Sequence, residues 1–329
     1  MQDFAALFRS FREMKVAVIG DVMLDSYMWG RVDRISPEAP VPVVALHSKE
    51  HSIGGAGNVA LNAHALGASL SVFSVLGQDE GADRLTELFQ HHGIRTGGLV
   101  RSARRRTTSK TRIISRNQQM MRVDDEMTEP LEPADADALI TSIGDYISAE
   151  RPDILIFEDY NKGVLSAPVI SAVLEHCRRS SVLTAVDPKR MHFFDYAGVD
   201  LFKPNLKEVR EALNLMGDAV SLTSLQAIHQ ELIAKLHHRI SFITLSEKGV
   251  FYQMGNQSAM IPSHLRHIAD VSGAGDTVIA VAALVYAATQ NVHLMAEVAN
   301  IAGGLVCETV GTTSVSAERL LQECELLLS

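Results

Sequence analysis

The chain has 329 residues, of which 47% are hydrophobic and 21% charged, and its formal net charge is −9. This composition is typical of a globular protein, excludes a disordered or collagenous chain, and argues against a general nucleic-acid binder. We expect a cytoplasmic protein without a membrane span or a disulfide framework, because the chain lacks a long apolar run, an apolar leader and a CxxC pair.

Short apolar segments rich in β-branched residues recur along the chain, separated by stretches with helical periodicity. Segments that are apolar on both faces are typical of parallel strands covered by helices. Such strands are predicted at 14–21, 69–77, 153–159, 181–187, 200–205 and 241–246. Helices are predicted at 59–66 and 276–290, the second almost wholly apolar and therefore buried. This alternation predicts an α/β fold with a doubly wound, mostly parallel sheet and helices on both faces.

Two segments do not fit the alternation. Residues 22–46 contain three prolines and the only tryptophan, and residues 106–123 alternate like an exposed pair of strands. We predict that they form a small β-sheet lid inserted into a single domain spanning 1–329. The alternative is a pair of long surface loops.

The segment Asp270-Val271-Ser272-Gly273-Ala274-Gly275-Asp276-Thr277 stands directly before the apolar helix. Small residues at a helix N-terminus let backbone N–H groups converge on an anion, and the helix dipole adds positive charge. We therefore predict an anion hole, formed by Ser272, Gly273, Ala274 and Gly275. Asp276 should lie at the helix start with its pKa kept low. A simple helix cap is the alternative.

A second glycine-rich segment, Gly54-Gly55-Ala56-Gly57-Asn58, precedes the helix predicted at 59–66. Glycines permit close approach of a ligand to the backbone, and Asn58 offers both a donor and an acceptor. Gly55-x-Gly57-x-x-Ala60 also matches the dinucleotide fingerprint, but the polar residues 48–52 stand where that fingerprint requires a strand. The chain has no Walker A motif, which excludes a P-loop kinase.

Polar residues follow several of the predicted strands. In open α/β sheets, ligands bind at the carboxyl ends of strands. The residues at such ends are Asp21, Asp159, Asp187, Asn205 and Ser246. Asn205 and Glu208 are three residues apart at a helix start, where they could hold a hydrated Mg²⁺ ion. They also fit a capping box.

The stretch from Arg101 to Arg122 contains basic residues and no acidic ones. It has no interleaved aromatic residues on which nucleic-acid bases could stack, and a solvated sheet edge is the simplest interpretation. We favour a lid surface that supplies cations to an anionic substrate. Arg112 and Arg116, on one face of an alternating strand, are the best candidates.

These motifs resemble the ribokinase-like (PfkB) carbohydrate kinase family along nearly the whole chain. GGAGN and DVSGAGDT are similar to its two signatures, and Asn205-x-x-Glu208 is similar to its magnesium motif. GDVMLDSYMWG, RISPEAPVPVV, SRNQQMMRVD and DYNKG resemble the family members that phosphorylate D-glycero-β-D-manno-heptose 7-phosphate. Glu158, which we assign to the lid, departs from the resemblance, since relatives often have a small residue there.

The resemblance implies ATP-dependent phosphorylation of this heptose phosphate at O1, for ADP-heptose and lipopolysaccharide inner-core synthesis. It implies that Asp276 is the catalytic base, that Mg²⁺ is held through water by Asn205 and Glu208, and that K⁺ binds at Asp270 and Ser272. The implied ATP contacts are Asn205, Glu208, Ser246, Gly249, Gly273, Gly275 and Asn300. The implied substrate contacts are Asp21, Asp25, Gly54, Gly55, Asn58, Arg112, Arg116, Lys162, Asp187 and Lys189.

The resemblance further implies a homodimer formed through the lid, with no nucleic-acid or membrane partner. The chain has no HxGH motif, so a separate adenylyltransferase is expected to use the product. Three alternatives stay open: a kinase of another sugar or sugar phosphate, a nicotinamide-dependent oxidoreductase, and a non-catalytic sugar-binding regulator. The last would be expected to lack Asp276 or the Gly273/Gly275 turn.

Overall fold

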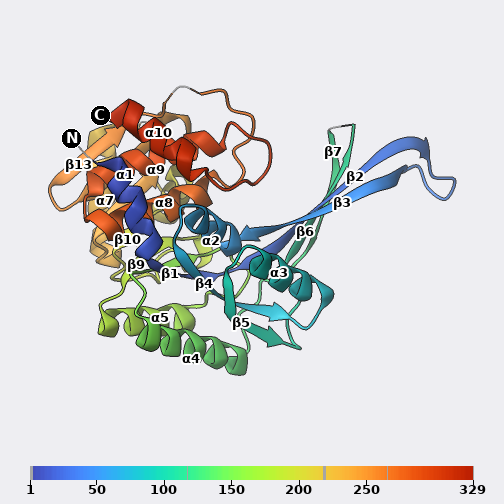
Figure 1. The fold of residues 1–329 in the computed structure, drawn as a ribbon, viewed down its shortest axis with the longest axis horizontal. Helices are drawn as coiled ribbons and strands as arrows, with labels where there is room; N and C mark the ends of the chain where they lie inside the picture. Colours follow the sequence, from blue (N-terminus) through green and yellow to red (C-terminus); the bar gives the residue numbers. More distant parts are fainter. Residues whose placement is uncertain (1–2, 117, 218–219, 265, 329) are drawn as a thin grey trace.

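The structure is a computed structural model that describes residues 3–116, 118–217, 220–264 and 266–328. Its main sheet has nine strands (Figure 1). They are β1 (Lys15–Gly20), β4 (Ser69–Gly77), β5 (Arg95–Ser102), β8 (Ile154–Glu158), β9 (Leu183–Asp187), β10 (Leu201–Phe202), β11 (Ile240–Thr244), β12 (Val250–Met254) and β13 (Gln257–Ile261). Their order is β13-β12-β11-β10-β9-β8-β1-β4-β5. The strands from β11 to β5 are parallel, and β12 and β13 continue the sheet as an antiparallel edge.

Helices cover both faces of this sheet. One face carries α1 (Phe4–Ser10), α2 (Ala56–Ala65), α3 (Glu80–His91), α8 (Ala274–Thr289), α9 (Val292–Val306) and α10 (Ala317–Leu328). The other face carries α4 (Pro133–Glu150), α5 (Ala167–Ser180), α6 (Leu206–Leu213) and α7 (Leu222–Leu236). Short 3₁₀ turns lie at Phe11–Glu13, Arg190–His192 and Ser246–Lys248. The predicted doubly wound α/β fold is confirmed.

The apolar pattern of β1 explains why the strand is buried on both faces. Val16 and Val18 pack into the core beneath α2 and α8, while Ala17 and Ile19 pack into the core beneath α4 and α5. Alternate side chains of a strand point to opposite faces, so a strand between two helix layers has to be apolar throughout. The first eleven side chains of α8 from Asp276 are buried, as expected for a helix that is apolar all round.

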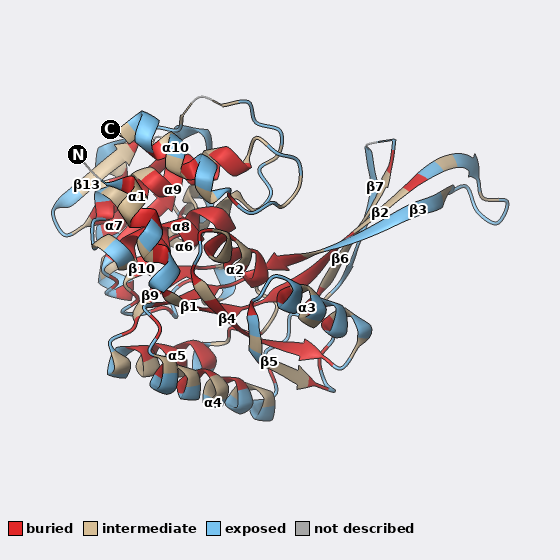
Figure 2. Cartoon of the chain, in the orientation of Figure 1, coloured by how far each residue is buried: buried red, intermediate tan, exposed pale blue. Residues whose placement is uncertain are grey.

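A separate four-stranded sheet projects from the body of the protein (Figure 1). It consists of β2 (Val22–Ile35), β3 (Pro42–Gly55), β6 (Ser109–Ser115) and β7 (Gln118–Asp125), in the order β3-β2-β6-β7. The strand β2 begins two residues after β1 ends, so Asp21 lies at the junction of the two sheets. All of β7 and most of β3 are exposed (Figure 2). This sheet is the lid, and it contains most of both predicted segments.

The structure corrects several predicted boundaries. The strand predicted at 200–205 is only the two-residue β10, and the lid extends beyond residue 46 to the end of β3. Residues 48–52, interpreted as a polar interruption, lie within β3; they are polar because this lid strand is largely exposed. The helix predicted at 59–66 begins earlier, at Ala56. Among the described residues, no helix is long and apolar enough to cross a membrane.

Candidate active site

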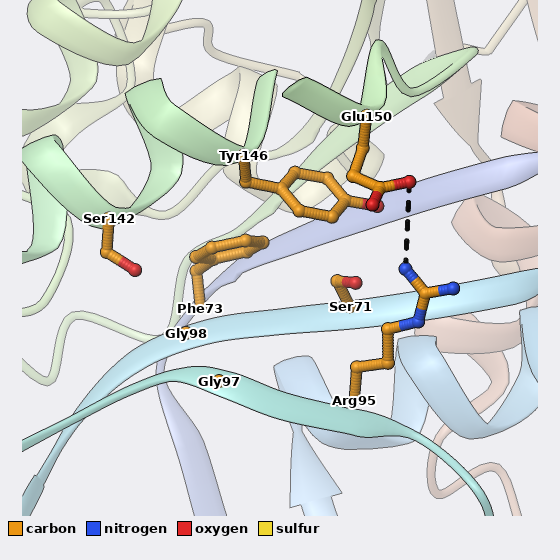
Figure 3. Close-up of a pocket in the computed structure, with 8 residues that line it drawn as sticks. All are labelled: Ser71, Phe73, Arg95, Gly97, Gly98, Ser142, Tyr146 and Glu150. Atoms are coloured by element: carbon orange, nitrogen blue, oxygen red, sulfur yellow. Dashed lines mark ion pairs between the residues drawn. The ribbon is translucent and has the colours of Figure 1, made fainter. Parts of the chain in front are cut away.

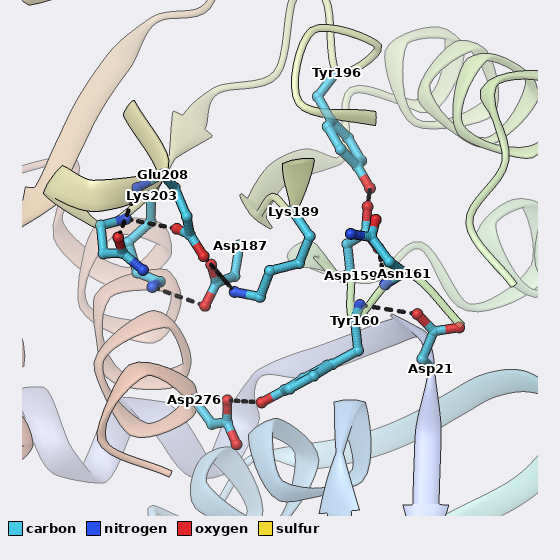
Figure 4. Close-up of polar contacts among 11 residues, drawn as sticks. Asp21, Asp159, Tyr160, Asn161, Asp187, Lys189, Tyr196, Lys203, Glu208 and Asp276 are labelled. Atoms are coloured by element: carbon cyan, nitrogen blue, oxygen red, sulfur yellow. Dashed lines mark hydrogen bonds and ion pairs between the residues drawn. The ribbon is translucent and has the colours of Figure 1, made fainter. Parts of the chain in front are cut away.

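The predicted polar residues lie at the carboxyl ends of the parallel strands, as expected. Asp21 follows β1, Asp159 follows β8 and Asp187 ends β9. Asn205 and Ser246 follow β10 and β11. Figure 4 shows Asp187 beside Lys189 and Lys203, Asp276 in contact with the Tyr160 hydroxyl, and Asp21 beside the Tyr160 backbone. The parallel sheet therefore gathers residues that are far apart in the sequence into one site.

Asp276 lies in the first turn of α8 and is buried, with 5% of its surface exposed. The Asn58 Nδ2 group donates a hydrogen bond to Asp276 Oδ2 over 2.7 Å, and the Tyr160 hydroxyl donates to Oδ1 over 2.7 Å. Asn58 comes from α2 and Tyr160 from the loop after β8. Three separate segments therefore fix the orientation of this carboxylate.

The prediction of a low pKa for Asp276 is wrong. Burial raises the pKa of this carboxyl to about 6, although the hydrogen bonds from Asn58 and Tyr160 act in the opposite direction. The nearby Asp187 charge raises the pKa further, and Lys203 lowers it. Desolvation by the surrounding core outweighs the helix dipole on which the prediction depended. The carboxylate is consequently a stronger base than an exposed aspartate.

The turn before α8 supplies only part of the predicted anion hole. Gly273 caps the helix at φ +76°, a conformation that favours glycine. The N–H of Ser272 donates to Asp270 Oδ1 over 2.9 Å, and the N–H of Ala274 donates to the Val271 carbonyl over 3.3 Å. Of the four predicted donors, only the N–H groups of Gly273 and Gly275 have no acceptor among the described residues.

Asp21 was predicted to bind a sugar, but both of its oxygens are occupied by the backbone. Oδ2 accepts from the N–H groups of Tyr160 and Lys162 over 2.9 and 3.0 Å, and Oδ1 accepts from Val164 over 3.1 Å. The side chain is 2% exposed, and burial raises its pKa. Asp21 therefore holds the loop that carries Tyr160, and the structure does not leave its carboxylate free for a hydroxyl group.

The loop after β8 is further fixed by Asp159. Its Oδ1 accepts from the N–H of Asn161 over 2.7 Å, and its Oδ2 accepts from the Tyr196 hydroxyl over 2.9 Å. Burial, followed by the charge of Asp21, raises the pKa of Asp159 to about 6. The carboxyl group of Asp159 thus links the loop backbone to Tyr196 (Figure 4).

A chain of ion pairs crosses the site from β9 to α6. Asp187 contacts Lys203 Nζ through Oδ2 at 2.9 Å and Lys189 Nζ through Oδ1 at 3.3 Å. Lys189 also contacts Glu208 Oε1 at 2.9 Å. Lys189 and Asp187 were predicted to bind substrate, and the structure instead pairs them with each other. The prediction did not include Lys203, which is 2% exposed and lies beside Gly275.

Asn205 and Glu208 form the capping box that was left open as an alternative. Asn205 Oδ1 accepts from the N–H of Glu208 over 2.9 Å, and Glu208 Oε2 accepts from the N–H of Asn205 over 2.8 Å. With Lys189 on the other carboxylate oxygen, Glu208 has a partner on each oxygen. Capping is therefore established, and a magnesium role would come in addition to it.

A cavity of about 1070 Å³ adjoins this site. Its lining includes residues of the α8 start, the β11 end and α9. The predicted ATP contacts among the lining residues are Asn205, Ser246, Gly249, Gly275 and Asn300. Gly249 has φ +91°, and a Cβ atom there would lie 2.0 Å from the Ile261 carbonyl oxygen, so only glycine fits. Five of the seven predicted ATP contacts thus lie around one cavity, and the other two, Glu208 and Gly273, are not among its lining residues.

The second glycine motif joins the lid to α2. A Cβ atom on Gly54 would lie 2.2 Å from Asp25 Oδ2, and one on Gly55 would lie 2.3 Å from the Asp21 carbonyl oxygen. These glycines therefore allow close packing of β3 against β2. The motif does lie at the end of a strand, but that strand is β3 of the lid, which pairs antiparallel with β2. The dinucleotide fingerprint requires a strand of the parallel main sheet.

Five of the eight basic residues between Arg101 and Arg122 are paired with acids. Arg112 Nη1 contacts Asp25 Oδ1 at 2.6 Å, and its guanidinium lies 5.1 Å from the centre of the Tyr27 ring. Lys162 Nζ contacts Glu126 Oε1 at 2.7 Å. Arg116 does not share a strand face with Arg112, because β6 ends at Ser115 and Arg116 lies exposed in the turn, with φ +50°.

Besides Lys203, three residues that the prediction did not assign to the site lie within it: Lys110, Glu158 and Tyr160. Lys110 Nζ lies 5.7 Å from the centre of the Tyr160 ring, and it has no carboxylate within 4.0 Å among the described residues. Glu158 was assigned to the lid, but it ends β8 in the main sheet. Burial, and then the charges of Asp187 and Asp276, raise the pKa of Glu158 well above its ordinary value. In the sequence, the only signal for a role of Tyr160 in the site is its position directly after Asp159, at the end of a predicted strand.

Asp270 lies at the rim of the site. Its Oδ1 accepts from the N–H and the hydroxyl of Ser272 over 2.9 and 2.8 Å, and its Oδ2 accepts from the N–H of Gly311 over 2.9 Å. These hydrogen bonds lower the pKa of Asp270. The carboxylate is therefore ionised and holds the glycine turn in place.

A smaller cavity of about 200 Å³ lies elsewhere, between α4 and strands β4 and β5 (Figure 3). It is lined by the early residues of these strands, including Ser71 and Arg95, and Arg95 contacts Glu150 at 3.8 Å. It thus lies toward the amino ends of the strands, opposite the edge where ligands bind in this class of fold.

Comparisons with known proteins agree with this geometry. "Bifunctional protein HldE" of Pelobacter propionicus is 38% identical over 98% of this chain, and that of Geobacter sulfurreducens is 37% identical over 96%. The chain spans 65% and 64% of the length of these two relatives.

Solved structures share the fold. Phosphofructokinase-2 from Escherichia coli, in complex with potassium, has a TM-score of 0.78 at 16% identity, covering 96% of this chain and 100% of its own. Arabidopsis thaliana ribokinase, complexed with ribose and ATP, has a TM-score of 0.70 at 15% identity, covering 94% and 99%. Residues 13–319 match the pfkB family carbohydrate kinases. The chain therefore belongs to this family of carbohydrate kinases.

Proposed function

We propose that the enzyme transfers the γ-phosphoryl group of ATP to O1 of D-glycero-β-D-manno-heptose 7-phosphate, giving the 1,7-bisphosphate and ADP. The observation that supports phosphoryl transfer best is the buried Asp276 carboxylate beside free N–H groups and a large cavity. The choice of sugar is supported by similarity to proteins named HldE and by the resemblance of RISPEAPVPVV and SRNQQMMRVD to heptose-phosphate kinases.

In the proposed reaction Asp276 accepts the proton of the sugar O1 hydroxyl. O1 forms a bond to the γ-phosphorus while the bond between that phosphorus and the β,γ-bridging oxygen breaks, and ADP leaves. A pKa of about 6 leaves the carboxylate mostly ionised at neutral pH, yet basic enough to take up a proton. Asn58 and Tyr160 keep it aimed, since each donates to a different oxygen.

The transferring phosphoryl group carries negative charge on its oxygens. The free N–H groups of Gly273 and Gly275 and the positive end of the α8 dipole would stabilise that charge. Lys203 adds a buried cation, since its Nζ lies 3.9 Å from where a Cβ atom on Gly275 would be. Because the surrounding core excludes water, these interactions act in a medium of low dielectric constant.

The oxygen donors of Asn205 and Glu208 fit a hydrated Mg²⁺ ion, and Asn205 lines the cavity. Bound Mg²⁺ would neutralise charge on the ATP phosphates. Glu208 would have to act through water, because each of its oxygens already has a partner. Asp270 and Ser272 offer oxygen atoms for a monovalent cation, K⁺, next to the glycine turn.

The phosphate of the sugar would bind among cations near the lid. Lys110 is the best placed of these, because no carboxylate oxygen of the described residues lies within 4.0 Å of its ammonium. Arg112 is half-buried and paired with Asp25, and Lys162 and Lys189 are held by acids. A phosphate that enters would exchange these ion pairs for charge-assisted hydrogen bonds.

We also propose that the lid forms a homodimer interface. It exposes apolar side chains on a projecting sheet, among them Ile35 at 61% and Met121 at 58%, and such exposed patches are typical of contact surfaces. The 1,7-bisphosphate would serve ADP-heptose and lipopolysaccharide inner-core synthesis through a separate adenylyltransferase.

Asp276→Asn removes the base and preserves its shape. We expect kcat to fall by roughly 10²–10⁴, with nearly unchanged ATP affinity. A coupled ADP-release assay over a panel of sugar phosphates measures both the loss and the preferred sugar. Asp137→Asn, on the exposed face of α4, is the matched control and should behave like the parent. Turnover close to the parent value in Asp276→Asn would reassign the carboxylate to a structural role.

The raised pKa of Asp276 also makes stability depend on pH. Folding favours the protonated carboxyl, since its pKa rises from 3.8 to about 6. The folded state therefore loses stability as the pH rises through this interval. Asp276→Asn removes that loss of stability at high pH. The difference in free energy of unfolding, variant minus parent, should therefore increase by about 2 kcal/mol between about pH 4.5 and about pH 8. Urea unfolding in a metal chelator measures this, and a difference independent of pH contradicts burial of the charge.

Asn205→Ala and Glu208→Gln test whether the capping box also serves Mg²⁺. Loss of the cap alone should cost about 1 kcal/mol of stability. We expect the variants, in addition, to need more Mg²⁺ for half-maximal activity. Ser221→Ala, which removes the corresponding cap of α7, is the control and should lower stability without moving the magnesium curve. If all three variants keep the parent's curve, the pair is only a cap.

Arg112→Ala should raise KM for the sugar phosphate about tenfold, with a smaller effect on KM for ATP, because one charge-assisted hydrogen bond is lost. It should also narrow the preference for heptose 7-phosphate over free heptose. Arg116→Ala serves as the control, since that residue lies in the exposed turn at the end of β6. Steady-state kinetics with both sugars decide, and equal kcat/KM values for the two sugars in the parent enzyme would reject phosphate binding at the lid.

A further inference from the structure

Three buried carboxyl groups meet between β8, β9 and α8. They are Glu158, Asp187 and Asp276, with exposed fractions of 0%, 4% and 5%. One oxygen of each lies within 4.8 Å of one oxygen of the other two. Like charges so close together in a medium of low dielectric constant repel one another strongly. Either a shared proton or a positive charge that reaches all three groups would relieve this repulsion.

Glu158 differs from the other two because nothing in the described structure satisfies it. Asp187 has the two lysines Lys189 and Lys203, and Asp276 has Asn58 and Tyr160. Neither oxygen of Glu158 has a hydrogen-bond partner, although the side chain is completely buried. A buried polar group without a partner is costly. Glu158 therefore points to a binding partner that occupies the space between these carboxylates.

The charges around the cluster identify the kind of partner. Glu158, Asp187, Asp276 and Glu208 supply four carboxylates, and Lys189 and Lys203 supply two ammonium groups. The difference, two negative charges, matches one divalent cation. A proton on Glu158 would remove one charge and could be shared with one neighbouring carboxylate. A metal ion can contact one oxygen of all three groups at once, and carboxylate oxygens suit Mg²⁺ or Mn²⁺.

The cluster also adjoins the large cavity, through which an ion could enter. Gly275 lines that cavity, and a Cβ atom on Gly275 would lie 3.6 Å from Asp187 Oδ2. The absence of a side chain at this position thus leaves Asp187 close to the cavity wall. Both lysines compete for Asp187, so the affinity for an ion should be moderate.

We propose that Glu158, Asp187 and Asp276 bind one divalent cation directly, in the absence of nucleotide. This site is separate from the water-mediated one at Asn205 and Glu208. Neither Asn205 nor Glu208 is among the three groups whose oxygens come together, and the Lys189 ammonium contacts both Glu208 and Asp187. The proposal does not depend on which sugar the enzyme uses.

The experiment titrates Mn²⁺ into the full chain without nucleotide or sugar, with free Mn²⁺ measured by electron paramagnetic resonance. We expect one Mn²⁺ per chain, displaced by Mg²⁺. Glu158→Gln has nearly the same shape without the charge and should weaken this binding at least tenfold. Asn205→Ala alters the other magnesium candidate without changing any charge near the cluster, and it should change Mn²⁺ binding less than about twofold.

Thermal unfolding in a chelator checks that the Glu158→Gln variant is folded. Its melting temperature should be no lower than that of the parent, because the substitution removes an unpaired buried acid. Parent protein that binds no Mn²⁺ under these conditions, or Glu158→Gln that binds it as tightly as the parent, overturns the proposal. A different preferred sugar in the kinase assay would refute the proposed substrate and leave the metal result untouched.

Discussion

The burial of a carboxylate at the start of an apolar helix is the constraint on which the site depends. Asp276 stays in place only because Asn58 and Tyr160 satisfy it, and Tyr160 stays in place because Asp21 binds the backbone of its loop. These residues come from β1, α2, α8 and the loop after β8. The reactive group is therefore oriented by the packing of the whole sheet against its helices, and the raised pKa of Asp276 follows from the same packing.

The sequence predicted what depends on local pattern. Strands between two helix layers must be apolar throughout, so β1, β4 and β8 could be found from their composition alone. Because parallel strands end at one edge, the polar residues that follow them could be assigned to a common site from their positions in the sequence. The antiparallel edge β12–β13 was not predicted. β13 is of mixed polarity, like a loop, and β12 is apolar but only five residues long, which is too short for a clear periodic pattern.

The partners of the charged side chains could not be predicted, because they depend on distances across the fold. Lys189 was expected to bind substrate and contacts Glu208, nineteen positions along the chain. Arg112 contacts Asp25 across neighbouring lid strands. The depth of burial is equally invisible in a local motif: the glycine turn suggested a stabilising helix dipole at Asp276, whereas desolvation has the larger effect.

These pairings explain how a chain with a net charge of −9 can keep cations ready for anionic substrates. Arg112, Lys162 and Lys189 are each neutralised by an acid of the protein itself, so no excess of positive charge persists without ligand. Two groups near the site depart from this balance in the part of the chain that the structure describes. Lys110 has acids nearby but no carboxylate oxygen within 4.0 Å of its ammonium, and Glu158 has no hydrogen-bond partner for either oxygen. An anion beside Lys110 and a cation beside Glu158 would balance these two charges. Such a pair fits an enzyme whose substrates are phosphates accompanied by metal ions.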